Sequence, residues 1–265
     1  MNVIGVDIGG TKIAAGRVNE NAAVLASHTI PTRAAEGFGV SIEQVWRAIQ
    51  PLMTPEVEAI GICAPGPLNP KTGVVVNPPN LPGWRDVPLT QLAQERVGLP
   101  VRLENDCNAA GLAEARFGAA RGLANVFYAA IGTGIGSGII LDGKIYHGKN
   151  GAAGEAGHMT VDYRSDIVCG CGVHGCIEAL ASGRAVNGNI DEIAIRLAAW
   201  LGGIVSLLDP DIVVLGGGVT QTGEELFARL RTKVPDWTVN PYAGMTPIVP
   251  AHYESGIVGA AALWL

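Results

Sequence analysis

The sequence predicts an α/β protein made of two lobes with a cleft between them. A strand, a glycine-rich turn and a second strand open the chain, and the same arrangement returns near residue 126. In both halves, strands then alternate with amphipathic helices, which is typical of α/β folds. We interpret this pattern as a duplicated architecture with two mixed-sheet cores. An interlobe cleft is a frequent place for a ligand.

Apolar runs, helical periodicity and turn residues define the elements of the first half. Strands are expected at 3–8, 13–18, 23–30, 57–63 and 101–103. Helices are expected at 41–52, at 91–97 and from about residue 106 to 117. Residues 64–88 are rich in Pro, Gly and Asn, so this region is expected to form ordered loops and turns.

The second half repeats this pattern. Strands are expected at 126–131, 139–141 and 211–215, and helices at 190–208 and 256–265. Residues 132–138 are expected to form a turn, and Asp142-Gly143 is a strong hairpin signal. The elements predict a small lobe at 1–106 and a large lobe at 107–265, with the last helix packing back on the small lobe.

Composition and charge exclude several classes of protein. The chain has 265 residues, of which 48% are hydrophobic and 16% charged, as expected for a globular protein. Its net charge is −6 and Lys and Arg do not cluster, so neither a nucleic acid nor an anionic membrane is an expected partner. The chain lacks a membrane-spanning apolar stretch and starts directly with a strand-like run. We therefore expect a cytoplasmic protein.

Three glycine clusters are candidate nucleotide-binding loops. Backbone N–H groups of glycines can face an anion, Thr11 adds a hydroxyl donor, and Asp7 can hold Mg²⁺ through water. Two such loops, one in each lobe, can clamp the triphosphate of ATP, and the third can let a nucleoside lie against the backbone. The candidate residues are Asp7, Gly9, Gly10, Thr11, Lys12, Gly132, Thr133, Gly134, Gly216, Gly217 and Gly218.

Each glycine cluster also has a purely structural interpretation. An ordinary hairpin turn accounts for the first cluster about as well as a phosphate loop does. Residues 132–138 carry four glycines at alternate positions, which is more than a hairpin needs. A strand follows them, so they are not a Rossmann fingerprint. The third cluster is alternatively a tight strand-to-helix turn.

A carboxylate at a strand-to-helix junction is the candidate catalytic base. Taken alone, Asp106 is best explained as a helix N-cap. Between two phosphate loops it suits a base, because a carboxylate can accept the proton of a weakly nucleophilic sugar hydroxyl. Asn105 can both donate and accept hydrogen bonds. Asn80, in the proline-rich region, can do the same or serve as a turn residue.

A group of cysteine and histidine residues predicts a metal site. His158, Cys169, Cys171 and Cys176 form a set of one nitrogen and three sulfur ligands, which suits tetrahedral Zn²⁺. Four protein ligands leave no open position, so this zinc is expected to be structural. His174 is a rival ligand in the same loop. Nearby polar residues are candidates to line a polyol pocket: Glu155, His158 and Glu178.

Five segments resemble the motifs of the ROK family (repressors, open reading frames, kinases), in the family's order and over nearly the whole chain. They are residues 7–12, 104–110, 132–138, 154–158 and 169–178. The resemblance implies an actin-like, hexokinase-like ATPase fold, a usual homodimer, and phosphorylation of a sugar 6-hydroxyl with ATP and Mg²⁺. It implies that Asp106 is the base and that zinc binds the four ligands above. The substrate-binding residues expected on this basis are Gly66, Asn80, Asn105, Asp106, Glu155, His158 and Glu178.

The chain departs from the family pattern in two places. Ala156 stands where the family often has Ile or Leu. The segment after Ser182-Gly183 is shorter than expected and passes through 187–189 into a long helix. A helical stretch is therefore expected to be missing, which affects the large lobe, the surroundings of the nucleotide and the dimer.

The preferred interpretation is a glucokinase that feeds glycolysis, because residues 157–162 are most similar to bacterial glucokinases. A kinase for N-acetylmannosamine or N-acetylglucosamine is the alternative, since it would use the same catalytic set. Polyphosphate can replace ATP as the donor, because phosphate loops do not read the base. A sugar-sensing repressor is disfavoured, since the first phosphate loop begins at Asp7 and leaves no room for a DNA-binding motif before it.

Overall fold

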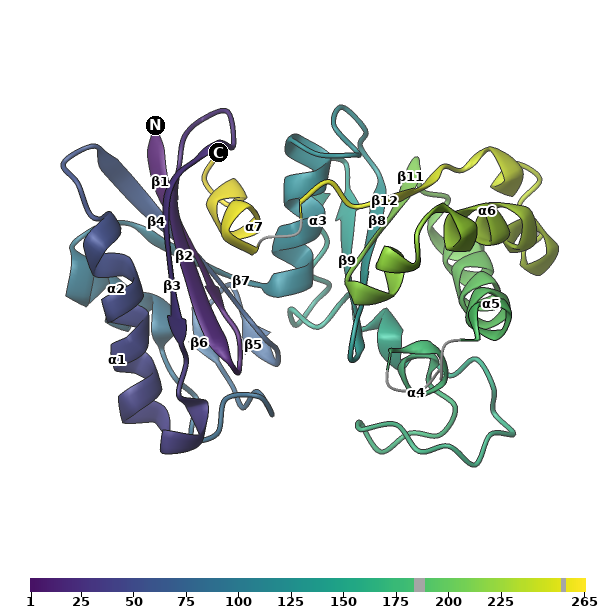
Figure 1. The fold of residues 1–265 in the computed structure, drawn as a ribbon, viewed down its shortest axis with the longest axis horizontal. Helices are drawn as coiled ribbons and strands as arrows, with labels where there is room; N and C mark the ends of the chain where they lie inside the picture. Colours follow the sequence, from purple (N-terminus) through teal and green to yellow (C-terminus); the bar gives the residue numbers. More distant parts are fainter. Residues whose placement is uncertain (184–188, 254–255) are drawn as a thin grey trace.

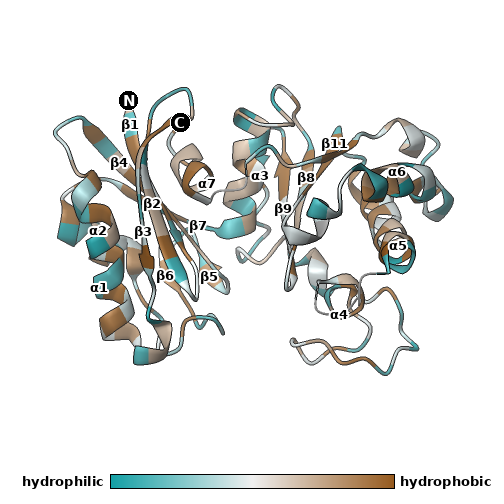
Figure 2. Ribbon diagram, in the orientation of Figure 1, coloured by the Kyte–Doolittle hydropathy of each residue, from teal (hydrophilic) through white to brown (hydrophobic). Residues whose placement is uncertain are grey.

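The computed structural model describes residues 1–183, 189–253 and 256–265. Two five-stranded sheets stand side by side, with helices between them and on their outer faces (Figure 1). Apolar residues concentrate along the strands (Figure 2), as expected for sheets buried by helices. No helix in the described residues is both long and apolar enough to cross a membrane.

The first sheet has the strand order β3-β2-β1-β4-β7. Its strands are β1 (Asn2–Ile8), β2 (Lys12–Val18), β3 (Val24–Pro31), β4 (Val57–Ala64) and β7 (Val101–Asn105). β1, β2 and β3 are antiparallel neighbours, whereas β1, β4 and β7 run parallel. A separate short ladder joins β5 (Leu68–Asn69) to β6 (Val74–Val75) within the proline-rich region.

The second sheet has the order β10-β9-β8-β11-β12 and repeats the first in both order and strand direction. Its strands are β8 (Val126–Ile131), β9 (Ile135–Leu141), β10 (Lys144–Ile145), β11 (Ile212–Gly216) and β12 (Ile248–Pro250). The first three are antiparallel, and β11 and β12 run parallel to β8. The predicted duplication of mixed-sheet cores is therefore confirmed.

Helices cover the outer faces of the two sheets and fill the space between them. The α-helices are α1 (Phe38–Ile49), α2 (Leu89–Val97), α3 (Asp106–Arg116), α4 (Ile177–Ala181), α5 (Ile190–Leu208), α6 (Glu224–Lys233) and α7 (Gly256–Ala262). Short 3₁₀ helices are η1 (Ala34–Glu36), η2 (Gln50–Leu52), η3 (Ala156–His158), η4 (Gly218–Thr222), η5 (Val234–Trp237) and η6 (Ala243–Met245). In Figure 1, α1 and α2 lie outside the first sheet, α5 and α6 outside the second, and α3 and α7 between them.

Each sheet has its own apolar core, and each core contains a fully buried tryptophan. Trp84 lies in the first core, where its indole N–H donates to Ser41 Oγ at 2.7 Å. Trp200 lies in the second core and donates to the Ala156 carbonyl oxygen at 3.0 Å. Both indoles are thus buried with their polar atom satisfied, which avoids the cost of an unpaired donor.

The C-terminal helix α7 lies against β1 and β4 of the first sheet. Two strand glycines make this close approach possible. A Cβ atom at Gly5 would lie 2.0 Å from the Ile257 carbonyl oxygen, and one at Gly61 would lie 1.8 Å from that of Ala260.

Every strand of the first sheet lies before residue 106, and every strand of the second lies after it. On this ground we propose the lobe boundary near residue 106.

The structure shortens the predicted turn at residues 132–138. β9 already begins at Ile135, so Gly136 and Gly138 are strand residues. Their Cβ atoms would lie 2.5 Å from Cys107 Sγ and 2.6 Å from the Cys107 carbonyl oxygen, so α3 can pack on β9 only where side chains are absent. Asp142 and Gly143 form the predicted hairpin, with positive φ angles of 51° and 72°.

Candidate active site

Asp106 is the first residue of α3, directly after β7 ends at Asn105. Asn105 Oδ1 accepts hydrogen bonds from the backbone N–H groups of Cys107 and Asn108, at 2.9 and 3.2 Å. The helix N-cap is therefore Asn105, and the N-cap interpretation of Asp106 is wrong. Asp106 Oδ1 accepts from the Cys107 N–H at 2.9 Å, and the side chain remains exposed to solvent. Its negative charge at a helix N-terminus is electrostatically favourable.

Two carboxyl groups of this region have raised pKa values. Desolvation by surrounding protein atoms raises the pKa of Asp106, and hydrogen bonds from Cys107 oppose that shift. Burial raises the pKa of Asp7 to about 6, and the nearby charge of Asp106 adds to the shift. The Cys63 thiol donates to Asp7 Oδ1 at 3.6 Å and, with Lys12, partly lowers the pKa again. Two neighbouring carboxylates that repel each other favour a cation between them.

Asp7→Asn is expected to stabilise the protein at alkaline pH when Mg²⁺ and nucleotide are absent. The folded-state pKa of about 6 exceeds the ordinary aspartate value of 3.8, so the neutral form favours folding and this contribution is lost as pH rises between the two values. Removing the charge should raise the free energy of unfolding by about 1–3 kcal/mol at about pH 8, and by much less near pH 4. Urea unfolding at both pH values measures this, and an equal gain at both would contradict the electrostatic explanation.

A cavity of about 280 Å³ brings four of the predicted substrate residues together: Gly66, Asn105, Asp106 and Glu155. Small-molecule sites usually have volumes of about 300–1,000 Å³. A volume near the lower end of this range suits a ligand as small as a monosaccharide. Because Asn105 Oδ1 caps the helix, its amide nitrogen is the group left to donate to a ligand. A Cβ atom at Gly66 would lie 3.7 Å from that nitrogen and 3.9 Å from Glu155 Oε1, in the space between them.

The other predicted substrate residues do not line this cavity. Asn80 is exposed and lies against the first glycine loop. Its backbone carbonyl oxygen would be 2.7 Å from a Cβ atom at Gly10. Glu178 Oε2 accepts from the Ile135 N–H at 2.9 Å. His158 belongs to the cysteine cluster described below. Their contact with a substrate stays a prediction.

The first glycine loop, between β1 and β2, is held by a residue outside it. Thr32 is fully buried, and its hydroxyl donates to the Gly9 carbonyl oxygen at 2.6 Å. Its backbone N–H donates to the Thr11 carbonyl oxygen at 3.0 Å. No local pattern indicates this role, because Thr32 follows an ordinary strand and lies more than 20 residues from Gly9.

Packing explains part of the other two glycine clusters. A Cβ atom at Gly134 would lie 2.5 Å from Glu178 Oε2, and one at Gly216 would lie 2.7 Å from the Tyr128 hydroxyl oxygen. Gly217 has a φ angle of 87°, which suits the turn into η4. In contrast, Gly132 and Gly218 have open space where a side chain would stand, and Thr133 is exposed. The role of all three clusters in nucleotide binding stays a prediction.

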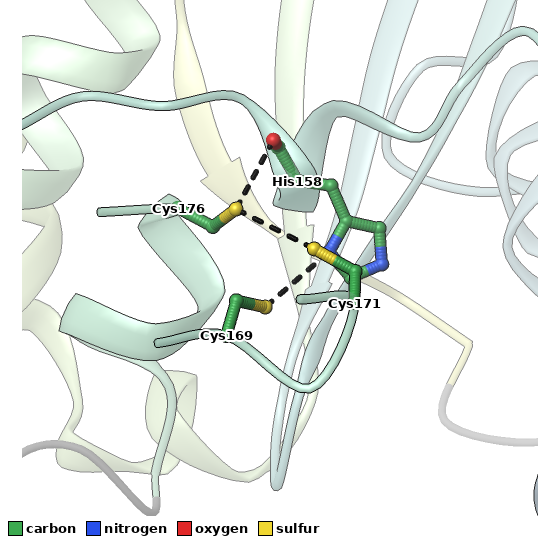
Figure 3. Close-up of side chains that lie close together, drawn as sticks. All are labelled: His158, Cys169, Cys171 and Cys176. Carbon is green, nitrogen blue, oxygen red and sulfur yellow. Dashed lines mark hydrogen bonds between the residues drawn. The ribbon is translucent and has the colours of Figure 1, made fainter. Parts of the chain in front are cut away.

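Four side chains converge from η3 and from the loop that leads into α4 (Figure 3). One ligand atom from each of His158, Cys169, Cys171 and Cys176 lies within 4.8 Å of the others. His158 Nδ1 is 3.6 Å from Cys169 Sγ, and the Sγ atoms of Cys171 and Cys176 are 3.7 Å apart. This spacing suits ligands around one tetrahedral ion. The rival ligand His174 is not part of the cluster.

Glu104 links the two lobes directly behind the Asp106 turn. Its side chain is buried, and Oε1 accepts from the Asn105 N–H at 2.9 Å and from Asn108 Nδ2 at 3.0 Å. Oε2 lies 2.6 Å from Nε2 of His147, which follows β10 in the second lobe. No local sequence pattern indicates this pair, because 43 residues separate its members.

Comparison with known proteins identifies the family of this chain. A family model described as the ROK family matches residues 3–192 and 187–265. The chain belongs to the ROK family. A glucokinase of Thermotoga maritima is 32% identical, with coverage of 99% of this chain and 97% of that protein. The structure of a ROK family glucokinase from Streptomyces griseus in complex with glucose and AMPPNP superposes with a TM-score of 0.85, at 33% identity and 99% coverage of both chains.

The ROK family also includes relatives that are named for another sugar. An N-acetylmannosamine kinase of Citrobacter koseri is 30% identical, with coverage of 99% of this chain and 98% of that protein. The predicted actin-like, hexokinase-like ATPase fold is confirmed by the S. griseus superposition.

A shortened segment after Ser182-Gly183 was expected, and residues 184–188 lie outside the described part of the chain. The family match is divided into two pieces that meet at 187–192. The alignment with the T. maritima protein spans 308 positions, more than the 265 residues of this chain, so that relative has residues that this ROK protein lacks.

Proposed function

We propose that this ROK protein is an ATP-dependent hexose kinase that phosphorylates the 6-hydroxyl group of glucose. One observation carries the proposal: an accessible carboxylate at a helix N-terminus, Asp106, lines a cavity of monosaccharide size together with Asn105 and Glu155. The similarity to a ROK glucokinase solved with glucose and AMPPNP supports both substrates.

In this mechanism Asp106 accepts the proton of the sugar hydroxyl as that oxygen attacks the γ-phosphate, whose bond to the bridging oxygen of the β-phosphate breaks to release ADP. Desolvation by surrounding protein atoms raises the pKa of Asp106 above its ordinary value, which makes it a stronger base than a typical aspartate. Asn105 donates from its amide to a sugar oxygen, and Glu155 accepts from a hydroxyl. The glycine loops would hold the phosphates, and Asp7 would hold Mg²⁺, which would supply positive charge next to the phosphates.

We propose a structural Zn²⁺ at the four-residue cluster of His158, Cys169, Cys171 and Cys176. Zn–S bonds of about 2.3 Å in a tetrahedron place two sulfur atoms about 3.8 Å apart. The Cys171–Cys176 separation of 3.7 Å supports this fit. Cys169 Sγ also lies 3.5 Å from Glu178 Oε1, so the ion would fix the position of Glu178 as well as that of His158.

A coupled ADP-release assay across five sugars tests the proposed substrate. We expect the highest kcat/KM with glucose, compared with mannose, fructose, N-acetylglucosamine and N-acetylmannosamine. A preference for N-acetylmannosamine would instead support the alternative, which the C. koseri relative motivates. A parallel assay of glucose 6-phosphate formation with polyphosphate as donor tests the ATP assignment. No turnover with any sugar or donor would contradict the kinase proposal.

We further propose that the enzyme acts in the cytoplasm as a homodimer and feeds glycolysis. The family resemblance supports the dimer, and five unpaired cysteines fit a reducing compartment. Light scattering of the purified protein measures the assembly, and a monomer at micromolar concentration would contradict a stable dimer.

A further inference from the structure

A second cavity, of about 540 Å³, lies at the junction of the two lobes. Lys71, which follows β5, and Arg102 of β7 contribute from the first lobe. Arg116 of α3 and Lys144 of β10 contribute from the second. This cavity is larger than the candidate sugar cavity and shares none of its lining residues. The chemistry already proposed for this protein does not use it.

The lining of this cavity carries a strong excess of positive charge. Lys71, Arg102, Arg116 and Lys144 are cationic, and Glu104 is the single carboxylate in the lining. Glu104 is already satisfied by His147 and by two donors behind it. Four cations gathered around one hollow are unexpected in a chain whose net charge is −6.

None of these four cations forms an ion pair within the described residues. Arg102 and Arg116 each donate one hydrogen bond to a carbonyl oxygen at the end of α7, those of Leu263 and Ala262. Burial lowers the pKa of Arg116, and the charge of Arg102 lowers it further. The two guanidinium groups therefore repel each other, and both retain unused N–H donors.

The orientation of the cationic groups is partly fixed. The guanidinium carbon of Arg102 lies 4.0 Å from the centre of the Trp264 ring, so a cation–π contact holds its plane. A guanidinium held in one orientation loses less conformational entropy when it binds an anion. Apolar side chains of the lining, Leu103, Leu112 and Ile145, can face the uncharged part of a ligand.

We propose that this interlobe cavity binds a small, multiply charged phosphate compound. Two guanidinium and two ammonium groups match the negative charge of a ligand with two phosphate groups. A ligand with a single carboxylate would leave most of the repulsion among the four cationic side chains uncompensated. The volume lies within the range of about 300–1,000 Å³ that is usual for small-molecule sites. A ligand in this cavity would contact both lobes at once and would lie against Glu104. Oε1 of Glu104 accepts hydrogen bonds from Asn105 and Asn108, on either side of Asp106 in the chain.

Isothermal titration of the full chain with inorganic pyrophosphate, without Mg²⁺, tests this proposal. The wild type is expected to bind saturably, and Lys71→Gln/Lys144→Gln to bind at least about tenfold more weakly. Both lysines are exposed, and their ammonium groups form no hydrogen bond or ion pair within the described residues. The double variant should therefore fold normally.

The control is Arg96→Gln/Arg121→Gln, which removes the same charge from exposed positions outside this cavity. It should change the affinity by no more than about twofold, because distant surface charges are screened. Pyrophosphate bound only at the glycine loops would give equal affinities for the cavity variant and the wild type, and this result would overturn the proposal. Absence of saturable binding to the wild type would overturn it as well.

Discussion

Asp106→Asn is expected to lower kcat for sugar phosphorylation about 10³-fold, within the range of about 10² to 10⁴ for loss of a general base. The variant keeps an oxygen that can accept from the Cys107 N–H, so the first turn of α3 should remain intact. The amide cannot accept the hydroxyl proton. Steady-state kinetics with glucose and ATP measure the loss, and a sugar dissociation constant close to that of wild type shows that binding survives.

The matched control for this variant is Asp236→Asn, an exposed change in η5 of the second lobe. It removes one negative charge without touching the sugar cavity and should leave kcat unchanged. If Asp106→Asn turned over at a rate near that of wild type, another group would have to accept the proton. The assignment of Asp106 as the base would then be wrong.

Cys176→Ser is expected to abolish stoichiometric zinc and to lower the free energy of unfolding by several kcal/mol, because structural zinc binding is coupled to folding. Cys176 is fully buried, and its Sγ also lies 3.3 Å from the His158 carbonyl oxygen. Loss of the ion would release the loop that positions both His158 and Glu178. Metal analysis and thermal unfolding of the wild type and the variant measure the two effects.

His174→Ala provides the control for this second prediction. His174 was the rival ligand and lies outside the cluster, so the variant should keep about one zinc per chain, whereas His158→Ala should lose it. Zinc that persists in Cys176→Ser, or a wild-type protein purified without chelators that contains none, would contradict the proposed site.

The sequence was sufficient to predict the order of the longer strands and of most helices, because each half repeats a strand–turn–strand unit followed by alternating helices and strands. It also predicted the cysteine cluster, since Cys169, Cys171 and Cys176 are close in the chain. The short elements β10 and β12 and the helix α6 were not predicted. β10 and β12 have only two and three residues, too few for a periodic signal.

The packing role of the glycines was the feature that the sequence predicted least well. The alternate glycines at residues 132–138 were interpreted as a phosphate loop rather than an ordinary hairpin, yet Gly136 and Gly138 make room for α3. A sequence does not show which atom would meet an absent side chain. The same limit hid Thr32 and the Glu104–His147 pair, because tertiary contacts between distant residues leave no local pattern.

The packing of α7 on β1 has a consequence for synthesis of the chain. Val3 and Val18 form one buried cluster with Ile257 and Ala261, so β1 and β2 are completed by residues that are translated long after them. Before α7 is synthesised, the face of the first sheet that α7 covers is exposed, and exposed apolar surface favours aggregation. The first sheet can therefore reach its final packing only after α7 has been synthesised, so its folding cannot be completed while the strands alone are present.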